Sequence, residues 1–290
     1  MQIMEMARGC NQSFEELPSI DQQLTFSKLS IELIRVLGIE QLNRDILKTL
    51  ELYSDQNGFN NAAALLADTN SFKGIDIIRF GNSINEIMER KSLENISILL
   101  QMEQCIQMFH QYYRYEKIEG MDRKSVDKIP ERDFREAVAN ALVHRMWDIP
   151  ASIKISMYSD KIEISSPGGL PAGISEDEYL NGQISLLRNP IIGNVFFRLK
   201  YIEKFGTGIM RINYAYKDAL IKPDYHIFSN SIQIILPVIK SDYKLNETEK
   251  KLLNILKING SMTRNEIEKA AEIDKSKAIR GLNRLIETKM

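Results

Sequence analysis

The strongest constraint on the fold is the order of helix and strand patterns between Pro130 and Val238. Residues 131–147 place apolar residues at helical spacing, after a proline that the first turn of a helix tolerates. Two alternating hydrophobic runs, joined by the turn-like residues 158–160, then predict a β-hairpin. Two or three helices and a second hairpin around Ser229 complete the order. This order predicts an α+β domain in which helices cover one face of a mainly antiparallel sheet.

The segment before this region is predicted to be mostly helical. Apolar residues recur at helical spacing over residues 29–53 and again over residues 83–115. Between them, Asn60 or Asn61 can start a short helix, and residues 74–80 have the alternation of a strand. Nothing in this segment has the spacing of a catalytic site, so we expect it to supply packing surfaces.

The C-terminal segment is predicted to contain three short helices. The first two begin with a capping residue that a glutamate follows three positions later: Asn246 with Glu249, and Thr263 with Glu266. Three such helices fit a helix-turn-helix. The 290-residue chain therefore has three expected parts: a mostly helical region with a short strand (1–124), an α+β domain (125–240) and a helix-turn-helix (241–290).

Composition excludes several classes of protein. The 38 Lys and Arg residues are balanced by 39 Asp and Glu residues, so no global charge attracts the chain to nucleic acid or membrane. Two cysteines are too few for a disulfide framework or a cysteine-rich zinc site. No run of 18 apolar residues and no secretory signal pattern occurs in the sequence. We therefore expect a soluble cytoplasmic protein whose basic surfaces are local.

The most chemically suggestive pair is Glu136 and Asn140, which share one face of the predicted helix because they are four residues apart. A carboxylate there can orient or deprotonate a water, and a carboxamide oxygen can ligate Mg²⁺. Glutamate and asparagine on a solvated helix face are also a common arrangement without any function. His144, one turn further, is better interpreted as a structural residue.

Two glycine-containing bends give this pair a context. Gly168 and Gly169 follow a predicted strand, where they let the backbone turn sharply and approach a ligand. Gly206, Thr207 and Gly208 precede a predicted helix, whose amide groups and dipole can bind a phosphate. Together the bends suggest a phosphate pocket, although each alone is also typical of an ordinary turn.

Four stretches in this order resemble a known family. They are REAVANALVHR (135–145), KIEISSPGGLP (161–171), RNPIIGNVFFRL (188–199) and IEKFGTGIMRI (202–212). They are similar to the ATP-binding domain related to the C-terminal part of RecG-type helicases, which resembles the GHKL (Bergerat) fold of gyrase B, MutL, heat-shock chaperones and histidine kinases. The resemblance covers about residues 125–240 and implies a two-layer α/β sandwich that binds ATP and Mg²⁺.

The resemblance also implies a role for each matching residue. Glu136 would be the general base and Asn140 the Mg²⁺ ligand of the N-box. The remaining positions would contact the nucleotide or its lid: Gly168 and Gly169 beneath the adenine, Gly206, Thr207 and Gly208 at the phosphates, and Arg188 and Asn189 at the end of the lid.

The chain departs from the GHKL pattern at the first glycine box. Where that pattern has an aspartate that accepts from the adenine amino group, the nearest position here is Ser166, and Leu170 replaces the last glycine. A hydroxyl can accept a hydrogen bond but lacks the charge of a carboxylate. The sequence therefore leaves open whether ATP is bound selectively and whether it is hydrolysed.

The three C-terminal helices resemble the winged helix-turn-helix that commonly follows this domain in bacterial transcriptional regulators. Residues 242–290 carry 11 Lys and Arg against 8 Asp and Glu, a net charge of +3. The residues expected to contact double-stranded DNA are Lys275, Ser276, Lys277, Arg280 and Arg284. A solvated basic face on a protein-interaction module is the alternative. Relatives often have an N-terminal AlbA-type domain and a wing after the last helix, so we expect a fragment, a split reading frame or a naturally shortened member.

Two functions follow from these patterns. The first is a cytoplasmic bacterial transcriptional regulator, in which a GHKL-like pocket for ATP and Mg²⁺, with at most weak ATPase activity, is coupled to a DNA-binding helix-turn-helix in a homodimer. The second is a non-catalytic dimeric DNA-binding regulator with a degenerate nucleotide pocket. A helicase is disfavoured because no Walker loop is present, and a histidine kinase because His110 lacks the context of a phosphoacceptor.

Overall fold

The computed structural model describes residues 13–171, 173–182, 186–203, 206–219, 221–239 and 246–287. The chain divides into two compact units, one that ends at Ile239 and one that begins at Lys240.

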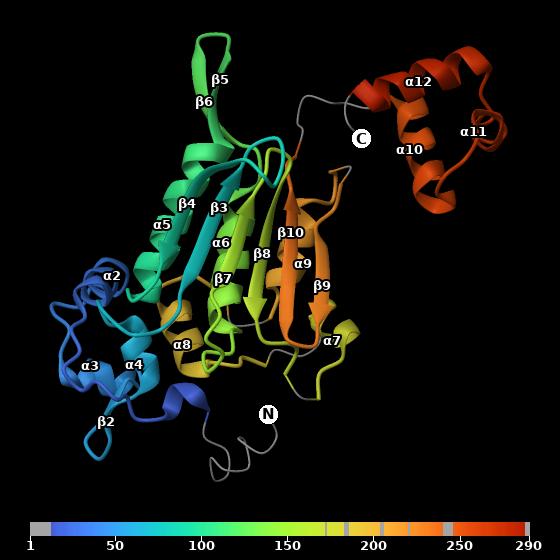
Figure 1. Ribbon diagram of the computed structural model, residues 1–290. Coiled ribbons are helices and arrows are strands. Elements are labelled where there is room, and N and C mark those ends of the chain that lie inside the picture. The colour runs from blue at the N-terminus through green and yellow to red at the C-terminus, as the bar shows by residue number, and fades with distance from the viewer. Residues whose placement is uncertain are drawn as a thin grey trace. The chain divides into compact units, whose positions relative to one another are not determined.

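A six-stranded sheet forms the centre of the first unit (Figure 1). Its strands, in spatial order, are β4 (Ile87–Leu93), β3 (Ile75–Phe80), β7 (Ile153–Met157), β8 (Lys161–Pro167), β10 (Ser231–Pro237) and β9 (Asp224–Phe228). Neighbouring strands are antiparallel except for β3 and β7, which pair in parallel. This architecture confirms the predicted α+β fold with a mainly antiparallel sheet.

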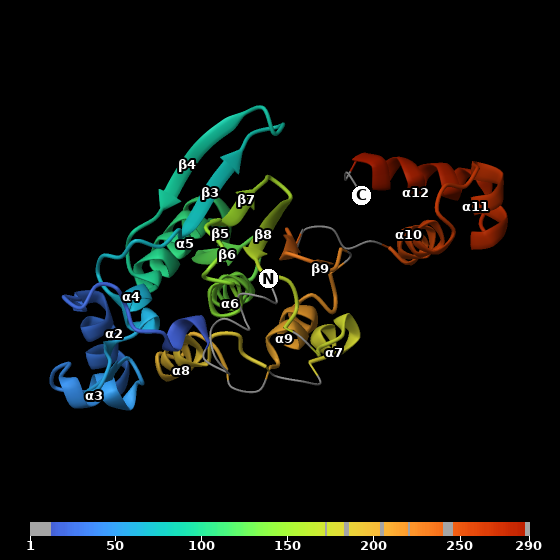
Figure 2. The same ribbon diagram turned by 60° about the horizontal axis from the view of Figure 1, so that its bottom comes forward.

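Helices cover one face of this sheet (Figure 2). They are α5 (Ile98–Tyr113), α6 (Glu131–Val143), α8 (Pro190–Arg198) and α9 (Gly208–Ala215), and the short α7 (Glu176–Leu180) lies near β9. Side chains alternate between the two faces of each strand, which explains this packing. Ile155, Ile164 and Ile234 are paired across three neighbouring strands, and all three are buried. Glu163 and Ser165, the neighbours of Ile164 along β8, are only half-buried. Helix α6 packs on β8 and on the other three large helices, so it occupies the middle of the layer.

The N-terminal part contributes directly to the sheet. Three helices and a small hairpin precede it: α2 (Ser27–Leu37), α3 (Arg44–Thr49), β1 (Tyr53–Ser54), β2 (Gly58–Phe59) and α4 (Asn61–Leu66). Asn60 caps α4 and residues 75–80 form β3, as predicted. Because β3 pairs with β7, strand pairing crosses the boundary that was expected at residue 124.

Two segments of the first unit differ from the sequence expectation. Residues 87–93, which helical spacing assigned to a helix, form the edge strand β4 because they pair with β3 over their length. Residues 114–127 form an unpredicted hairpin of β5 (Arg114–Glu119) and β6 (Asp122–Asp127), which projects beyond the sheet in Figure 1. Helix α6 also ends at Val143, earlier than the expected stop at Pro150. At β4, hydrogen bonding with the distant strand β3 therefore overrides the helical spacing of its apolar residues.

The second unit consists of α10 (Glu247–Asn259), α11 (Arg264–Ala271) and α12 (Lys275–Glu287). Asn246 with Glu249 and Thr263 with Glu266 form capping boxes, which confirms the predicted starts of α10 and α11. The core of this unit contains apolar side chains from all three helices: Leu252, Ile267, Ala271, Ala278 and Leu285.

Within the described ranges, none of the helices combines the length and the apolar character that crossing a membrane requires.

A buried carboxyl group ties the N-terminal part of the chain to α8. Glu15, in the short 3-10 helix Phe14–Glu16, is fully buried and accepts hydrogen bonds from the backbone amides of Ile191 (2.6 Å) and Ile192 (3.0 Å). These amides belong to the first turn of α8, which has no intrahelical acceptors for them. Burial raises the pKa of Glu15 to about 7 even though both hydrogen bonds favour the ionised form.

This shift predicts a pH dependence of stability that Glu15→Gln removes. A carboxyl whose pKa is higher in the folded state contributes stability that is full below pH about 4.5 and is lost as the pH rises through about 7. The free energy of unfolding of the wild type, relative to the variant, should fall by about 2–3 kcal/mol between pH 5 and pH 8. Urea denaturation at both pH values measures these free energies of unfolding, and the substitution of the exposed Glu40 by Gln is the control. If the difference in unfolding free energy between the wild type and Glu15→Gln is the same at both pH values, the raised pKa of Glu15 is contradicted.

Candidate functional site

Helix α6 positions Glu136 and Asn140 beside each other. Its opposite side is apolar and packs into the core through Phe134, Val138 and Leu142. Both polar residues are half-buried, and Nδ2 of Asn140 donates a hydrogen bond to Oε1 of Glu136 at 3.3 Å. The helical spacing predicted from the sequence therefore places the carboxylate and the carboxamide in contact.

The second glycine bend lies directly against this pair. Gly208 is the first residue of α9, and a Cβ atom added to it would come within 2.3 Å of Oε1 of Glu136 and 2.9 Å of Nδ2 of Asn140. Any other residue would displace these two side chains from the positions they occupy here, so glycine lets the start of α9 lie directly against them. Gly206 has a φ of +64°, in the left-handed region that favours glycine. The buried hydroxyl of Thr207 has no hydrogen-bond partner among the described residues.

The first glycine bend contacts protein on both sides. Gly168 has a φ of +108°, and a Cβ atom there would lie 2.7 Å from Cγ of Met146. A Cβ atom on Gly169 would lie 2.4 Å from the carbonyl oxygen of Ser229, in the turn between β9 and β10. These glycines are therefore explained by close packing against the residues after α6 and against that turn.

Three predicted site residues hold the C-terminal end of α6. The Ser166 hydroxyl donates to the Ala141 carbonyl at 2.8 Å. Arg188 donates through Nε to the His144 carbonyl (3.0 Å) and through Nη2 to the Gly169 carbonyl (2.7 Å). Buried Asn189 donates through Nδ2 to the carbonyls of Val143 (2.7 Å) and Arg145 (2.8 Å). These bonds satisfy carbonyl groups near the end of a helix, where intrahelical donors are lacking.

A narrow cleft joins these elements. Its volume is about 60 Å³, and Glu136, Asn140, Gly206 and Gly208 line it together with Tyr179 of α7. A smaller hollow of about 20 Å³ continues from Asn140 and Tyr179 toward Ser166 and Gly168. Because small-molecule sites usually measure roughly 300–1,000 Å³, a nucleotide would fit only after side chains in the cleft move.

Burial sets the protonation of the groups in the cleft. It raises the pKa of Glu136, while the hydrogen bond from Asn140 and the charges of Arg211 and Arg132 partly offset this effect. Burial, with a smaller effect from Arg188, lowers the pKa of His144 to about 4, so its imidazole is neutral at physiological pH. Burial raises the pKa of Tyr179 to about 12 and keeps the phenol protonated.

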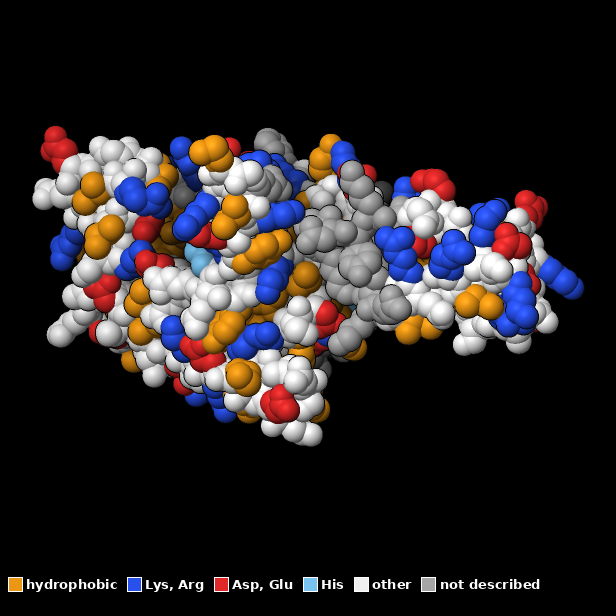
Figure 3. All heavy atoms as spheres, turned by 90° about the horizontal axis from the view of Figure 1, so that it is seen from above, with side chains coloured by type: hydrophobic (Ala, Val, Ile, Leu, Met, Phe, Trp, Pro, Cys, Tyr) orange, Lys and Arg blue, Asp and Glu red, His pale blue; other side chains and the backbone are white. Residues whose placement is uncertain are grey.

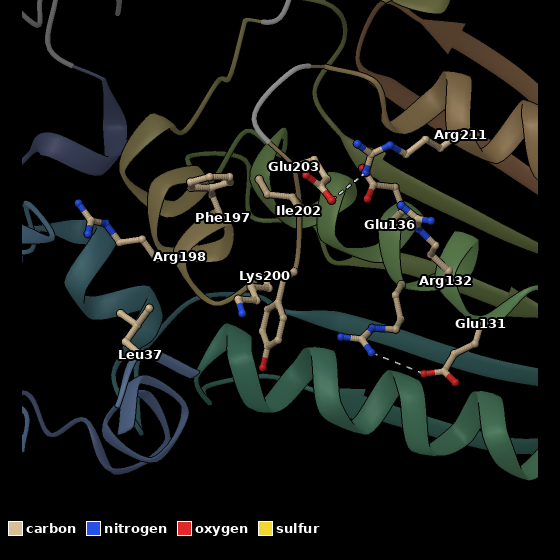
Figure 4. A pocket seen from close by; sticks show the side chains of 12 residues that line it. Leu37, Glu131, Arg132, Glu136, Phe197, Arg198, Lys200, Ile202, Glu203 and Arg211 are labelled. Carbon is tan, nitrogen blue, oxygen red and sulfur yellow. Dashed lines mark ion pairs between the residues drawn. The ribbon is translucent and has the colours of Figure 1, made fainter. Parts of the chain in front are cut away.

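The structure adds residues that the sequence analysis missed. Arg211 follows Gly208 by three positions on α9 and forms an ion pair with Glu203 at 3.1 Å (Figure 4). Its helical spacing from the second glycine bend was the signal that could have identified it. Tyr179 enters the cleft from α7, and no local pattern marked it as a site residue.

The donor set at this end of the cleft suits a magnesium ion that is held mainly by phosphate. The described residues contain no group of three or more His, Cys, Asp and Glu side chains that could hold a metal. Mg²⁺ keeps several waters and often takes one or two protein oxygens plus substrate phosphates. The Oδ1 atom of Asn140 is a donor of this kind beside Glu136 and the Gly208 backbone.

All five predicted DNA contacts are exposed on α12: Lys275, Ser276, Lys277, Arg280 and Arg284. Arg284 also forms an ion pair at 3.1 Å with Glu249, whose side chain is buried. Figure 3 shows Lys and Arg side chains, with acidic ones among them, on the surface of this unit.

Comparison with known proteins found a family similarity for the middle of the chain. Residues 151–236 match the family model described as "Putative ATP-dependent DNA helicase recG C-terminal". This region is therefore similar to an ATPase-like domain that is related to the C-terminal part of RecG. The match begins after α6, so it does not include Glu136 or Asn140. A search of curated proteins gave no match to this sequence.

A solved structure has the same fold. The crystal structure of the DIP2311 protein from Corynebacterium diphtheriae superposes with a TM-score of 0.68 at 18% sequence identity, over 98% of this chain. The chain spans 62% of the length of that protein.

Proposed function

We propose that the first unit binds ATP with Mg²⁺ in the cleft between α6, the end of β8 and the start of α9. The similarity of residues 151–236 to an ATPase-like family supports a nucleotide as the ligand. The observation that carries the proposal is the contact of the Gly208 backbone with Glu136 and Asn140, which puts a helix start, a carboxylate and a carboxamide at one point.

Each residue at this point has a distinct task in the proposal. The start of α9 offers backbone amides and the positive end of the helix dipole to phosphate oxygens. Asn140 would hold Mg²⁺ through Oδ1, and the ion supplies charge neutralisation of the phosphates when it is bound. Glu136, with its raised pKa, would accept the proton of an attacking water if hydrolysis occurs. Arg211, one turn along α9, forms an ion pair with Glu203, which lines the cleft, and so helps to position that wall.

The end of the cleft that would hold the adenine is too small for it unless side chains move. Tyr179 lies between the two hollows, so α7 or this side chain must move before an adenine can reach Ser166. The Ser166 hydroxyl already donates to Ala141, so only its lone pairs remain to accept from the adenine amino group. This arrangement favours weak base selectivity, and it also supports the alternative of a degenerate pocket in a non-catalytic dimeric DNA-binding regulator.

Calorimetry with ATP and Mg²⁺ tests the nucleotide proposal. We expect saturable binding to the wild type and at least tenfold weaker binding to Asn140→Ala and to Gly208→Ala, whose methyl group displaces Glu136. Glu136→Gln should still bind ATP but release no phosphate. The matched control is Gly81→Ala, between β3 and β4, where the added methyl group meets the exposed side chain of Glu86. Absence of binding to the wild type would refute the proposal and favour the degenerate pocket.

We further propose that α10–α12 bind double-stranded DNA as part of a homodimeric transcriptional regulator. The exposed cations at the start of α12 can contact phosphates, and Ser276 can reach a base edge. Arg284 is a weaker candidate for DNA contact because Glu249 already holds its guanidinium.

Substitutions in α12 distinguish contact from structure. In Lys275→Ala/Arg280→Ala, DNA affinity should fall, and the slope of log affinity against log salt should decrease by about 1 per lost phosphate contact. Arg284→Ala should instead destabilise the second unit by about 1 kcal/mol, because Glu249 loses its ion pair and keeps only the capping hydrogen bond from the Asn246 amide. Fluorescence anisotropy over a salt series and thermal denaturation measure the two effects. An unchanged salt slope in the double variant would contradict the DNA-binding assignment.

A further inference from the structure

A second and much larger groove lies next to the candidate nucleotide cleft (Figure 4). Its volume is about 870 Å³, within the range of small-molecule sites. The N-terminal half of α6 forms one wall, and the end of α8 with the residues that follow it (197–203) forms another. Leu37 of α2 and Arg211 of α9 also line the groove. Glu136 lines both this groove and the narrow cleft.

The groove carries an excess of positive charge. Its lining contains five cations (Arg132, Arg135, Arg198, Lys200 and Arg211) and three acids (Glu131, Glu136 and Glu203). Two of the cations are neutralised locally, since Arg135 pairs with Glu131 at 3.7 Å and Arg211 with Glu203 at 3.1 Å. Among the described residues, no carboxylate lies within ion-pair distance of the remaining three cations. With Glu136 as the one unpaired acid, the groove has a net charge of +2.

The backbone of Lys200 is unusual at this position. Its φ of +60° lies in the left-handed region, which disfavours residues with a side chain. Lys200 follows the end of α8 in a Schellman motif. The Lys200 amide donates to the Phe197 carbonyl (2.9 Å), and the Tyr201 amide donates to the Phe196 carbonyl (2.8 Å). Glycine is the favoured residue at such a position. A lysine there adds a cation to the groove.

The remaining lining is apolar. Leu37, Phe197, Tyr201 and Ile202 contribute side chains to the groove, and Figure 4 shows Lys200 close to Ile202 and Phe197. A ligand that matches the groove would therefore have an anionic group for the unpaired cations and an apolar or aromatic body for this surface. A phosphate monoester, which carries close to two negative charges at neutral pH, matches the net charge of the groove.

We propose that this groove binds a small phosphate monoester with an aromatic or apolar body. Arg132 and Lys200 contact the phosphate, and the body lies against Phe197 and Tyr201. This site is separate from the cleft that contains Asn140, so it does not depend on the nucleotide proposal. Since Glu136 lines both, a phosphate bound in the groove lies beside the carboxylate that faces the start of α9.

Phenyl phosphate is a suitable probe, because it combines the two features in one small molecule. A titration followed by phosphorus NMR should show saturable binding to the full chain, and inorganic phosphate alone should bind at least fivefold more weakly. In Arg132→Gln/Lys200→Gln the affinity for phenyl phosphate should fall at least tenfold. The control Arg44→Gln/Lys154→Gln removes two exposed cations outside the groove and should bind as the wild type does. No saturable binding to the wild type, or an equal loss in the control, would overturn the proposal.

The variant Asn140→Ala separates this site from the nucleotide cleft. If the groove is the site, this variant keeps its affinity for phenyl phosphate whether or not it binds ATP. A wild type that binds phenyl phosphate but no ATP would support the groove and refute the nucleotide proposal alone. Loss of phenyl phosphate binding in Asn140→Ala, or its complete displacement by ATP, would place the probe in the narrow cleft and overturn the groove proposal.

Discussion

The arrangement of the first unit depends on the contact between α6 and the backbone at the start of α9. A side chain at position 208 would displace Glu136, since its Cβ atom would overlap Oε1 of that residue. The contact keeps two polar side chains of a central, mostly buried helix next to unpaired amides of another helix. In the proposal, an anion with a bound cation would bond both elements. The chemistry of the cleft follows from this packing constraint.

The same helix is held at its other end by donors from three segments. Ser166, Arg188 and Asn189 all bond carbonyl groups at or just after the C-terminus of α6. They fix α6 against β8 and the first glycine bend, so they determine where Glu136 and Asn140 lie. These residues were predicted as nucleotide contacts, and their observed bonds give them a positioning role whether or not they also touch a ligand. Close packing likewise explains Gly168 and Gly169.

Local patterns predicted much of this fold, and contacts between distant segments account for the rest. The α6 helix, the hairpins β7–β8 and β9–β10 and the capping boxes of α10 and α11 depend on nearby residues, and their sequence patterns were sufficient. Strand β4 was wrongly predicted because its pairing with β3 overrides the helical spacing of its residues. Spacing also predicted the Glu136 and Asn140 pair. The position of Tyr179 in the cleft and the ion pair of Arg284 with Glu249 depend on tertiary packing that no sequence pattern encodes.

The most direct test of the account is a crystal structure of the protein with Mg²⁺ and a non-hydrolysable ATP analogue. The account predicts phosphate oxygens within hydrogen-bond distance of the backbone amides at the start of α9, a magnesium ion ligated by Oδ1 of Asn140, and a displaced Tyr179. A nucleotide bound elsewhere, with the contact between Gly208 and Glu136 and the narrow cleft both unchanged, would contradict it.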